Sequence, residues 1–243
     1  MKRGFGLATL MTAALLAGCE PSSMPDAASS AAPTAGEAVA PATSAGGAPV
    51  LKAASYPPRD DCSALPGWAA FRTQLEKAVA ARDADALAAI TDPDIRLDFG
   101  GGAGVKTLRA RLDDPQYRLW DELAAILPLG CGSHDGDGAA MPWIFVNSPG
   151  DADAFTSMLV LGNAVPAYAR SDRGAPVTAT LDWPLVTVEN YGGKDKEFTE
   201  VTLPQGAGKA FVETAKLRSL VAYRLLATRT PQGWRITALI AGD

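Results

Sequence analysis

Histidine, cysteine and aromatic residues are scarce in this chain of 243 residues. It contains one histidine and three cysteines, and aromatic side chains make up 7% of the sequence. This scarcity argues against a histidine-rich metal site and against a catalytic set built on histidine. A basic excess is also lacking, because 27 acidic residues outnumber 22 basic ones and the formal net charge is -5. Since phosphate binding needs a basic surface, nucleic acid is not expected as a partner.

Long hydrophobic runs are missing too, and the one apolar stretch of note lies at the amino terminus. Lys2 and Arg3 precede the apolar residues 7–16. A stretch of this length is too short to cross about 30 Å of hydrocarbon as a helix. Residues 1–18 are therefore predicted to be an export signal.

The signal ends in Leu16-Ala17-Gly18-Cys19, which resembles the lipobox of bacterial lipoproteins. The resemblance implies that Cys19 becomes the first residue of the mature chain and carries acyl groups such as palmitate, which anchor the protein in a membrane. Glu20 stands where Gram-negative lipoproteins retained in the inner membrane usually have aspartate. The resemblance therefore implies an outer-membrane anchor facing the periplasm.

Residues 19–57 are predicted to form a disordered tether. Of the 38 residues in 20–57, 29 are Ala, Pro, Ser, Thr or Gly. Such a segment cannot bury enough apolar surface to offset its ordering entropy. A flexible chain of this length spans about 35 Å root-mean-square. The folded part is expected to begin near residue 58.

Apolar spacing predicts a helical α+β part over residues 58–150. Phe71, Leu75 and Val79 recur every four residues, as on one face of an amphipathic helix. Asp83 is well placed as the N-cap of the next helix. The expected elements are helices over 65–81, 83–90, 106–112 and 116–127, strands over 95–99 and 141–146, and a loop over 130–140.

Residues 151–219 have the pattern of a small all-β unit. Short apolar runs predict strands near 158–161, 177–181, 185–188, 198–203 and 210–212. Their order and spacing, including Leu181-Asp182-Trp183 and Phe198-Thr199-Glu200-Val201, resemble bacterial SH3-like domains. The resemblance implies a small β-barrel. The candidate ligand-binding residues in a groove of that barrel are Tyr168, Trp183, Tyr191 and Phe198, and the alternative is that these aromatic residues form its core.

The chain ends in a predicted β-hairpin. Pro231-Gln232-Gly233 separates the β-like runs 223–228 and 234–240. Together with the first helices, this hairpin resembles an NTF2-like domain. Two arrangements remain open: residues 220–243 complete the part over 58–150 and the SH3-like unit is inserted, or two domains follow one another. The predicted fold class is α+β in either case.

Two segments resemble functional sites, one a phosphate loop and one an acid–base carboxylate, but both are predicted to be structural. Residues 100–107 follow a strand and open a helix as a phosphate loop does, but Val105 stands where that pattern needs glycine. Asp98 alternates with Leu97 and Phe99, which places it on the solvent face and not in an NTF2-like pocket. No catalytic residue, metal or cofactor is therefore predicted.

Cys62 and Cys131 are predicted to form a disulfide. They are the two cysteines left once Cys19 carries lipid, and an exported chain meets an oxidising compartment. One precedes the first helix and the other follows the last helix of the same part. The alternative is two separate buried thiols.

The leading functional interpretation is a non-enzymatic envelope lipoprotein held at the membrane by its lipid. Its SH3-like unit would bind a peptide, a cell-wall component or an envelope protein. The first alternative is an NTF2-like pocket that binds or converts a small molecule. A second alternative is a structural accessory of an envelope complex.

Overall fold

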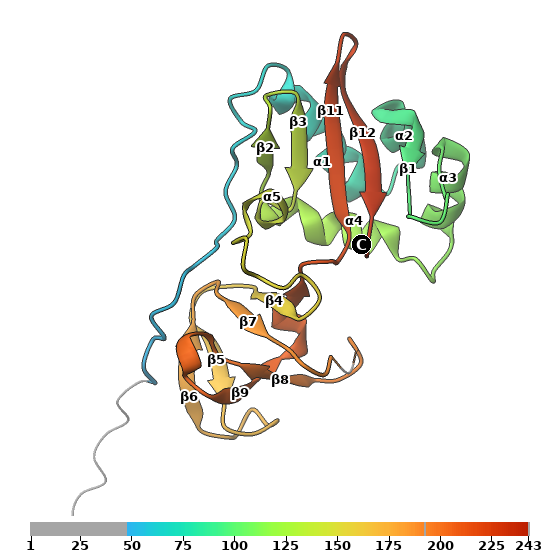
Figure 1. Cartoon of the computed structure of the whole chain (residues 1–243). Helices are drawn as coiled ribbons and strands as arrows, with labels where there is room; N and C mark the ends of the chain where they lie inside the picture. Colours follow the sequence, from blue (N-terminus) through green and yellow to red (C-terminus); the bar gives the residue numbers. More distant parts are fainter. Residues whose placement is uncertain (1–47, 192, 243) are drawn as a thin grey trace, which may run out of the picture. The chain divides into compact units, whose positions relative to one another are not determined.

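The computed structural model describes residues 48–191 and 193–242, which contain two β-sheets and a set of helices (Figure 1). The α+β class expected from the sequence is confirmed. The described residues belong to one structural unit. The lipobox and the tether up to residue 47 lie outside the described residues. Among the residues that are described, no helix is long and apolar enough to cross a membrane.

The first sheet has five strands in the order β1-β12-β11-β3-β2. β12 pairs in parallel with β1, and the other pairings are antiparallel. The strands are β1 (Thr91–Arg96), β2 (Gly132–His134), β3 (Gly138–Met141), β11 (Arg224–Thr230) and β12 (Gly233–Ile240). The carboxyl-terminal hairpin of β11 and β12 thus lies between β1 and β3, two strands that come much earlier in the sequence.

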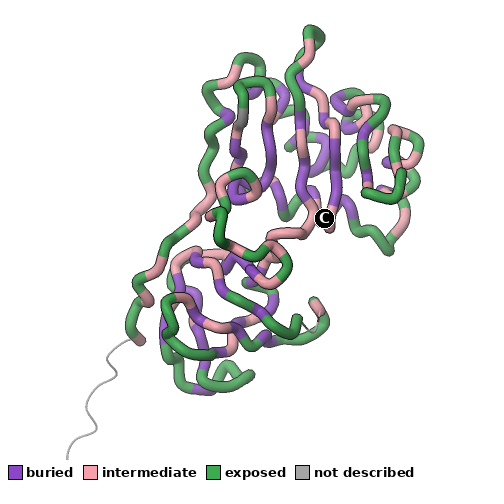
Figure 2. The backbone as a smooth tube through the Cα atoms, viewed as in Figure 1, coloured by how far each residue is buried: buried purple, intermediate pink, exposed green. Residues whose placement is uncertain are grey.

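Four helices share a hydrophobic core with this sheet. They are α1 (Trp68–Ala81), α2 (Ala84–Ala89), α3 (Val105–Asp113) and α4 (Leu119–Ile126), and α4 continues into the 3-10 turn η1 (Leu127–Leu129). The spaced residues Phe71, Leu75 and Val79 are buried, as predicted. Figure 2 shows buried stretches along the strands of both sheets. Asp83 is the N-cap of α2, because its carboxylate accepts the N–H groups of Asp85 and Ala86 at 3.0 and 2.9 Å.

Two predictions between residues 130 and 146 are wrong. The expected loop over 130–140 contains the β2–β3 hairpin, and the expected strand over 141–146 gives way after Met141 to helix α5 (Ile144–Asn147). The strand β3 is specified by distant partners, since it pairs with β11 in the register Met141 to Leu225. Strands this short and rich in glycine and alanine show no readable alternation in the sequence.

The second sheet has seven strands in the order β10-β4-β7-β8-β9-β5-β6. Its elements are β4 (Ser157–Val160), β5 (Val165–Tyr168), β6 (Val177–Leu181), β7 (Leu185–Thr187), β8 (Phe198–Thr202), η2 (Pro204–Gly206), β9 (Lys209–Glu213), η3 (Thr214–Lys216) and β10 (Leu217–Ser219). This sheet has a hydrophobic core separate from that of the first sheet. The strands β10 and β6 at the two ends do not pair with each other. The expected closed barrel is therefore not found among the described residues, and the sheet is open.

Residues 49–57, here called the strap, run along the edge strand β6. Thr180 donates its N–H to the Pro49 carbonyl and accepts the N–H of Leu51, both at 3.0 Å. Further along, the Tyr56 N–H donates to the Trp183 carbonyl at 2.8 Å. Leu51 packs on the core of the second sheet. The expected tether over 19–57 therefore ends earlier, because its last residues are hydrogen-bonded to the sheet.

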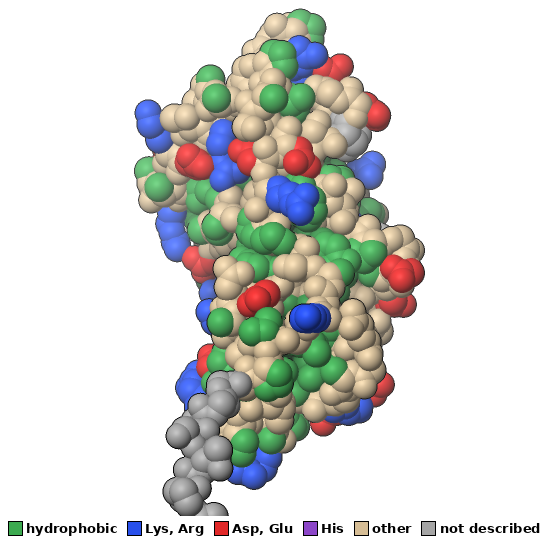
Figure 3. Space-filling view, turned by 90° about the vertical axis from the view of Figure 1, so that its left-hand side faces the viewer, with side chains coloured by type: hydrophobic (Ala, Val, Ile, Leu, Met, Phe, Trp, Pro, Cys, Tyr) green, Lys and Arg blue, Asp and Glu red, His purple; other side chains and the backbone are tan. Residues whose placement is uncertain are grey.

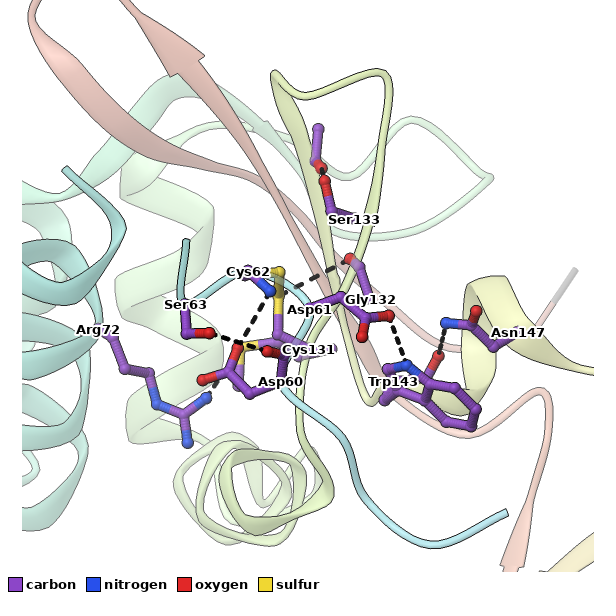
Figure 4. Close-up of a disulfide and its surroundings, with 12 residues drawn as sticks. Asp60, Asp61, Cys62, Ser63, Arg72, Cys131, Gly132, Ser133, Trp143 and Asn147 are labelled. Atoms are coloured by element: carbon purple, nitrogen blue, oxygen red, sulfur yellow. Dashed lines mark hydrogen bonds between the residues drawn. A yellow bond between two sulfur atoms is a disulfide. The ribbon is translucent and has the colours of Figure 1, made fainter. Parts of the chain in front are cut away.

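The predicted disulfide between Cys62 and Cys131 is present (Figure 4). Their Cα atoms are 5.7 Å apart, and both residues are fully buried. The backbone is paired on both sides of the bridge. Cys131 donates its N–H to the Arg59 carbonyl and accepts the N–H of Asp61, each at 2.8 Å. The bridge thus fixes the start of the helical part to the segment that opens β2.

Candidate binding groove

A groove of about 840 Å³ lies where three segments of the chain meet. These segments are the first turns of α4, Tyr191 with residues 194–197, and residues 213–223 with strand β10; Leu161, Arg173 and Ala241 complete the lining. Tyr191 supplies an aromatic ring to it, and 41% of this residue is exposed. The groove is open to solvent and of the size that holds small molecules or short peptide segments.

Ion pairs hold the walls of the groove. Lys194 donates to Glu122 of α4 at 2.6 Å, which links residues 194–197 to that helix. Arg173 forms a bidentate ion pair with Glu213, with N–O distances of 3.0 and 3.1 Å. Hydrogen bonding from Arg173 lowers the pKa of the Glu213 carboxyl below its usual value. Because the basic side chain of each pair is exposed, these pairs order the walls more than they stabilise the fold.

Charges of both signs line the groove in equal number. The basic residues are Arg118, Arg173, Lys194, Lys196 and Arg218, and the acidic residues are Asp121, Glu122, Asp195, Glu197 and Glu213. The same mixing is visible elsewhere on the surface, because Lys and Arg are interspersed with Asp and Glu on the face drawn in Figure 3. A groove with this balance favours a ligand that carries both charges over a purely anionic one.

Leu217, Arg218 and Tyr223 form a part of the lining where side chains are more buried. Leu217 is buried there, and Arg218 donates from Nη2 to the Tyr223 carbonyl at 2.6 Å. Burial lowers the pKa of the Arg218 guanidinium and raises the pKa of the Tyr223 phenol.

The structure does not bring the four predicted ligand-binding aromatics together. Tyr168 and Phe198 are buried and pack edge to face, with ring centroids 5.6 Å apart. Trp183 is half-buried in a separate cluster with Trp143. Only Tyr191 lines the groove. The alternative stated for these aromatics, that they pack in a core, describes the first two.

Asp98 orders the glycine turn that resembles a phosphate loop. Its Oδ1 accepts the N–H groups of Gly100 and Gly102 at 2.8 and 2.7 Å, and Arg111 pairs with its Oδ2. These contacts, led by the Arg111 hydrogen bond, lower the pKa of the Asp98 carboxyl. The chain's own carboxylate thus takes the N–H groups that a bound anion would use. Asp98 therefore acts in this turn as a structural residue.

One group of potential metal ligands occurs among the described residues. Asp60, Cys62 and Cys131 place their ligand atoms within 4.8 Å of one another. Both sulfur atoms are in the disulfide, so neither is available as a thiolate ligand. The group therefore gives no metal centre while the bridge is intact.

Comparison with known proteins finds no matching family model and no matching curated protein. Among solved structures, the chain is similar to the crystal structure of an NTF2-like protein with a cystatin-like fold from Novosphingobium aromaticivorans. The identity is 14% over 72% of this chain and 79% of that chain, with a TM-score of 0.27. A similarity at this level carries no argument about this protein.

Sequence reasoning missed most residues of the groove. Glu122, Arg173 and Lys194 are separated widely along the chain and meet only in the folded structure. Strand β10 has three residues, so it shows no alternation. The one available signal was the clustering of opposite charges over 194–197, which is typical of many solvated loops.

Proposed function

We propose that this protein is an exported, lipid-anchored binding protein that holds a peptide or a peptide-bearing cell-wall component in the groove. The single observation that carries the proposal is the groove itself, with Tyr191 exposed among charges of both signs. Exposed aromatic residues supply much of the binding energy at such surfaces. The side chains in this account bind and orient a ligand, and none is assigned a catalytic step.

The lipid anchor and the cellular location of the protein are part of the same proposal. The sequence Leu16-Ala17-Gly18-Cys19 supports acylation at Cys19, and Glu20 supports an outer-membrane location facing the periplasm. The tether up to residue 47 would let the folded part reach ligands away from the membrane surface. The SH3-like kinship of residues 151–219 is a further proposal, supported by strand spacing in the sequence.

The alternative of a small-molecule site beneath the first sheet is less favoured by the packing. Trp68 of α1 and Trp234 of β12 meet edge to face with ring centroids 5.0 Å apart. Phe71 lies next to both, and all three are buried. Because these rings fill the space between helix and sheet, the proposal places the ligand in the groove.

The proposal is tested on the mature lipidated chain in detergent micelles. The probes are purified peptidoglycan sacculi and a displayed library of random peptides made of L-amino acids. Tyr191→Ala should weaken capture about tenfold, the size expected for an aromatic anchor. The matched control is Phe155→Ala, because Phe155 is 67% exposed and lies outside the groove. Equal capture by both variants, or no capture of either probe by the wild type, would contradict the proposal.

A further inference from the structure

Strand β10 is one end of the seven-stranded sheet, and it lines the groove. The opposite end, β6, is covered by the strap through hydrogen bonds to Thr180. An uncovered edge strand presents backbone groups that can pair with another extended chain. The open edge and the candidate groove are thus the same part of this protein.

The pairing of β10 with β4 determines which backbone groups point outward. The Lys216 carbonyl accepts the N–H of Leu161 at 2.7 Å, and the register aligns Arg218 with Leu159. In an antiparallel pair, alternate residues direct both N–H and C=O toward the partner strand. Lys216 and Arg218 therefore direct their backbone N–H and C=O groups toward β4. Leu217 and Ser219 direct their backbone groups away from it.

The four outward groups are the N–H and C=O of Leu217 and of Ser219. Two of them are hydrogen-bonded within local turns. The Leu217 N–H donates to the Thr214 carbonyl, and the Ser219 carbonyl accepts the N–H of Ala222 at 3.2 Å. The Leu217 carbonyl and the Ser219 N–H have no hydrogen-bond partner among the described residues. They are one acceptor and one donor, two residues apart on the same edge. A single residue of a parallel strand would satisfy both. In a parallel pair, the N–H of a residue donates to a carbonyl on the neighbouring strand, and its C=O accepts the N–H of the residue two positions further along that strand.

We infer that the groove binds its ligand as an added strand: an extended segment of L-peptide lies parallel to β10. This inference rests on the proposed function and names its ligand class. One peptide residue donates its N–H to the Leu217 carbonyl and accepts the N–H of Ser219. Main-chain pairing of this kind gives affinity, while side chains give selectivity. The equal number of basic and acidic residues in the groove selects a segment that carries both charges.

The probe is a peptide enriched from the random L-peptide library on the mature chain in detergent micelles. Ser219→Pro removes the outward N–H but no hydrogen bond to β4, since residue 219 faces away from that strand. The matched control is Ser219→Ala, which keeps the N–H and loses the side-chain contact to the Val221 N–H. Ser219→Pro should weaken binding of the enriched peptide about tenfold, the upper range for one hydrogen bond, and Ser219→Ala should not.

A second measurement leaves the protein unchanged. The enriched peptide is N-methylated at one position at a time, which removes one backbone N–H in each variant. Methylation at one inner position should weaken binding about tenfold, and methylation at the adjacent positions should be tolerated. This scan keeps the inference testable if Ser219→Pro fails to fold.

The outcomes separate the inference from the proposed function. Sensitivity to one methylated position together with sensitivity to Ser219→Pro supports strand addition. A peptide that needs Tyr191 but tolerates every methylation overturns strand addition and leaves groove binding intact. Capture of sacculi with no enriched L-peptide also overturns it, because the occupant is then not a regular L-peptide strand. Failure to capture either probe overturns both.

Discussion

At the scale of single residues, the turn after β1 depends on the Asp98 carboxylate. This carboxylate accepts two backbone N–H groups and pairs with Arg111, and its pKa is lowered. A group whose pKa is lower in the folded state stabilises the fold above its unfolded value of about 4 and loses that effect as the pH falls. Asp98→Asn should therefore lower the urea midpoint at pH 7, and the difference from wild type should shrink at pH 3.

The control for this prediction is Asp94→Asn. Asp94 lies four residues earlier in β1, is exposed, and makes no side-chain hydrogen bond to the other described residues. Its substitution should leave the midpoint nearly unchanged at both pH values. A difference for Asp98→Asn that is as large at pH 3 as at pH 7 would show that its charge is not what orders the turn.

The disulfide is the other prediction at this scale. Cys62 and Cys131 are 69 residues apart in the sequence, so the bridge closes a long loop of the unfolded chain. Replacing both by alanine should lower the free energy of unfolding by about 2–4 kcal/mol, measured by urea denaturation without reductant. Titration of the unreduced, denatured wild type should find neither thiol. Two titratable thiols would contradict the bridge.

At the scale of elements, the strap is expected to stabilise the second sheet. Leu51 packs on the core of that sheet, while its neighbour Lys52 is exposed. Leu51→Ala should lower the free energy of unfolding by about 1 kcal/mol, because Leu51 is only partly buried. Lys52→Ala is the matched control and should change little. Equal effects of the two variants in urea denaturation would contradict packing of the strap.

Elements with local patterns were predictable from the sequence, and elements defined by distant partners were not. Phe71, Leu75 and Val79 show the helical spacing of α1, and Asp83 begins α2 as its N-cap. The strap has no such pattern, because its hydrogen bonds reach Thr180 and Trp183. The β2–β3 hairpin was missed for the same reason, since β3 is completed by β11.

The candidate site was predictable only in part. Tyr191 was named from the sequence and lines the groove. The sequence predicts the same role for Tyr168 and Phe198, but their alternating positions on strands bury them in a separate cluster. The outward carbonyl of Leu217 and N–H of Ser219 are backbone groups, so no side-chain pattern could have revealed them.

At the scale of the whole molecule, the anchor is expected to depend on one side chain. Cys19→Ser should abolish acyl labelling and leave the precursor unprocessed, because the hydroxyl cannot replace the acylated thiol. Metabolic labelling with a fatty acid, followed by mass measurement of the chain, checks this directly. Stable anchoring needs at least two acyl chains, since one gives only reversible membrane binding. Normal labelling of the Cys19→Ser chain would contradict the anchor.

The central claim, that the groove holds a peptide or a peptide-bearing cell-wall component, is tested most directly by photo-crosslinking in intact cells. A photoreactive phenylalanine analogue is placed at position 191 in the groove or at position 155 outside it, and the adducts are identified by mass spectrometry. The account predicts peptide or peptidoglycan adducts from position 191 and none from position 155. No adduct from position 191, or the same adducts from both positions, would contradict it.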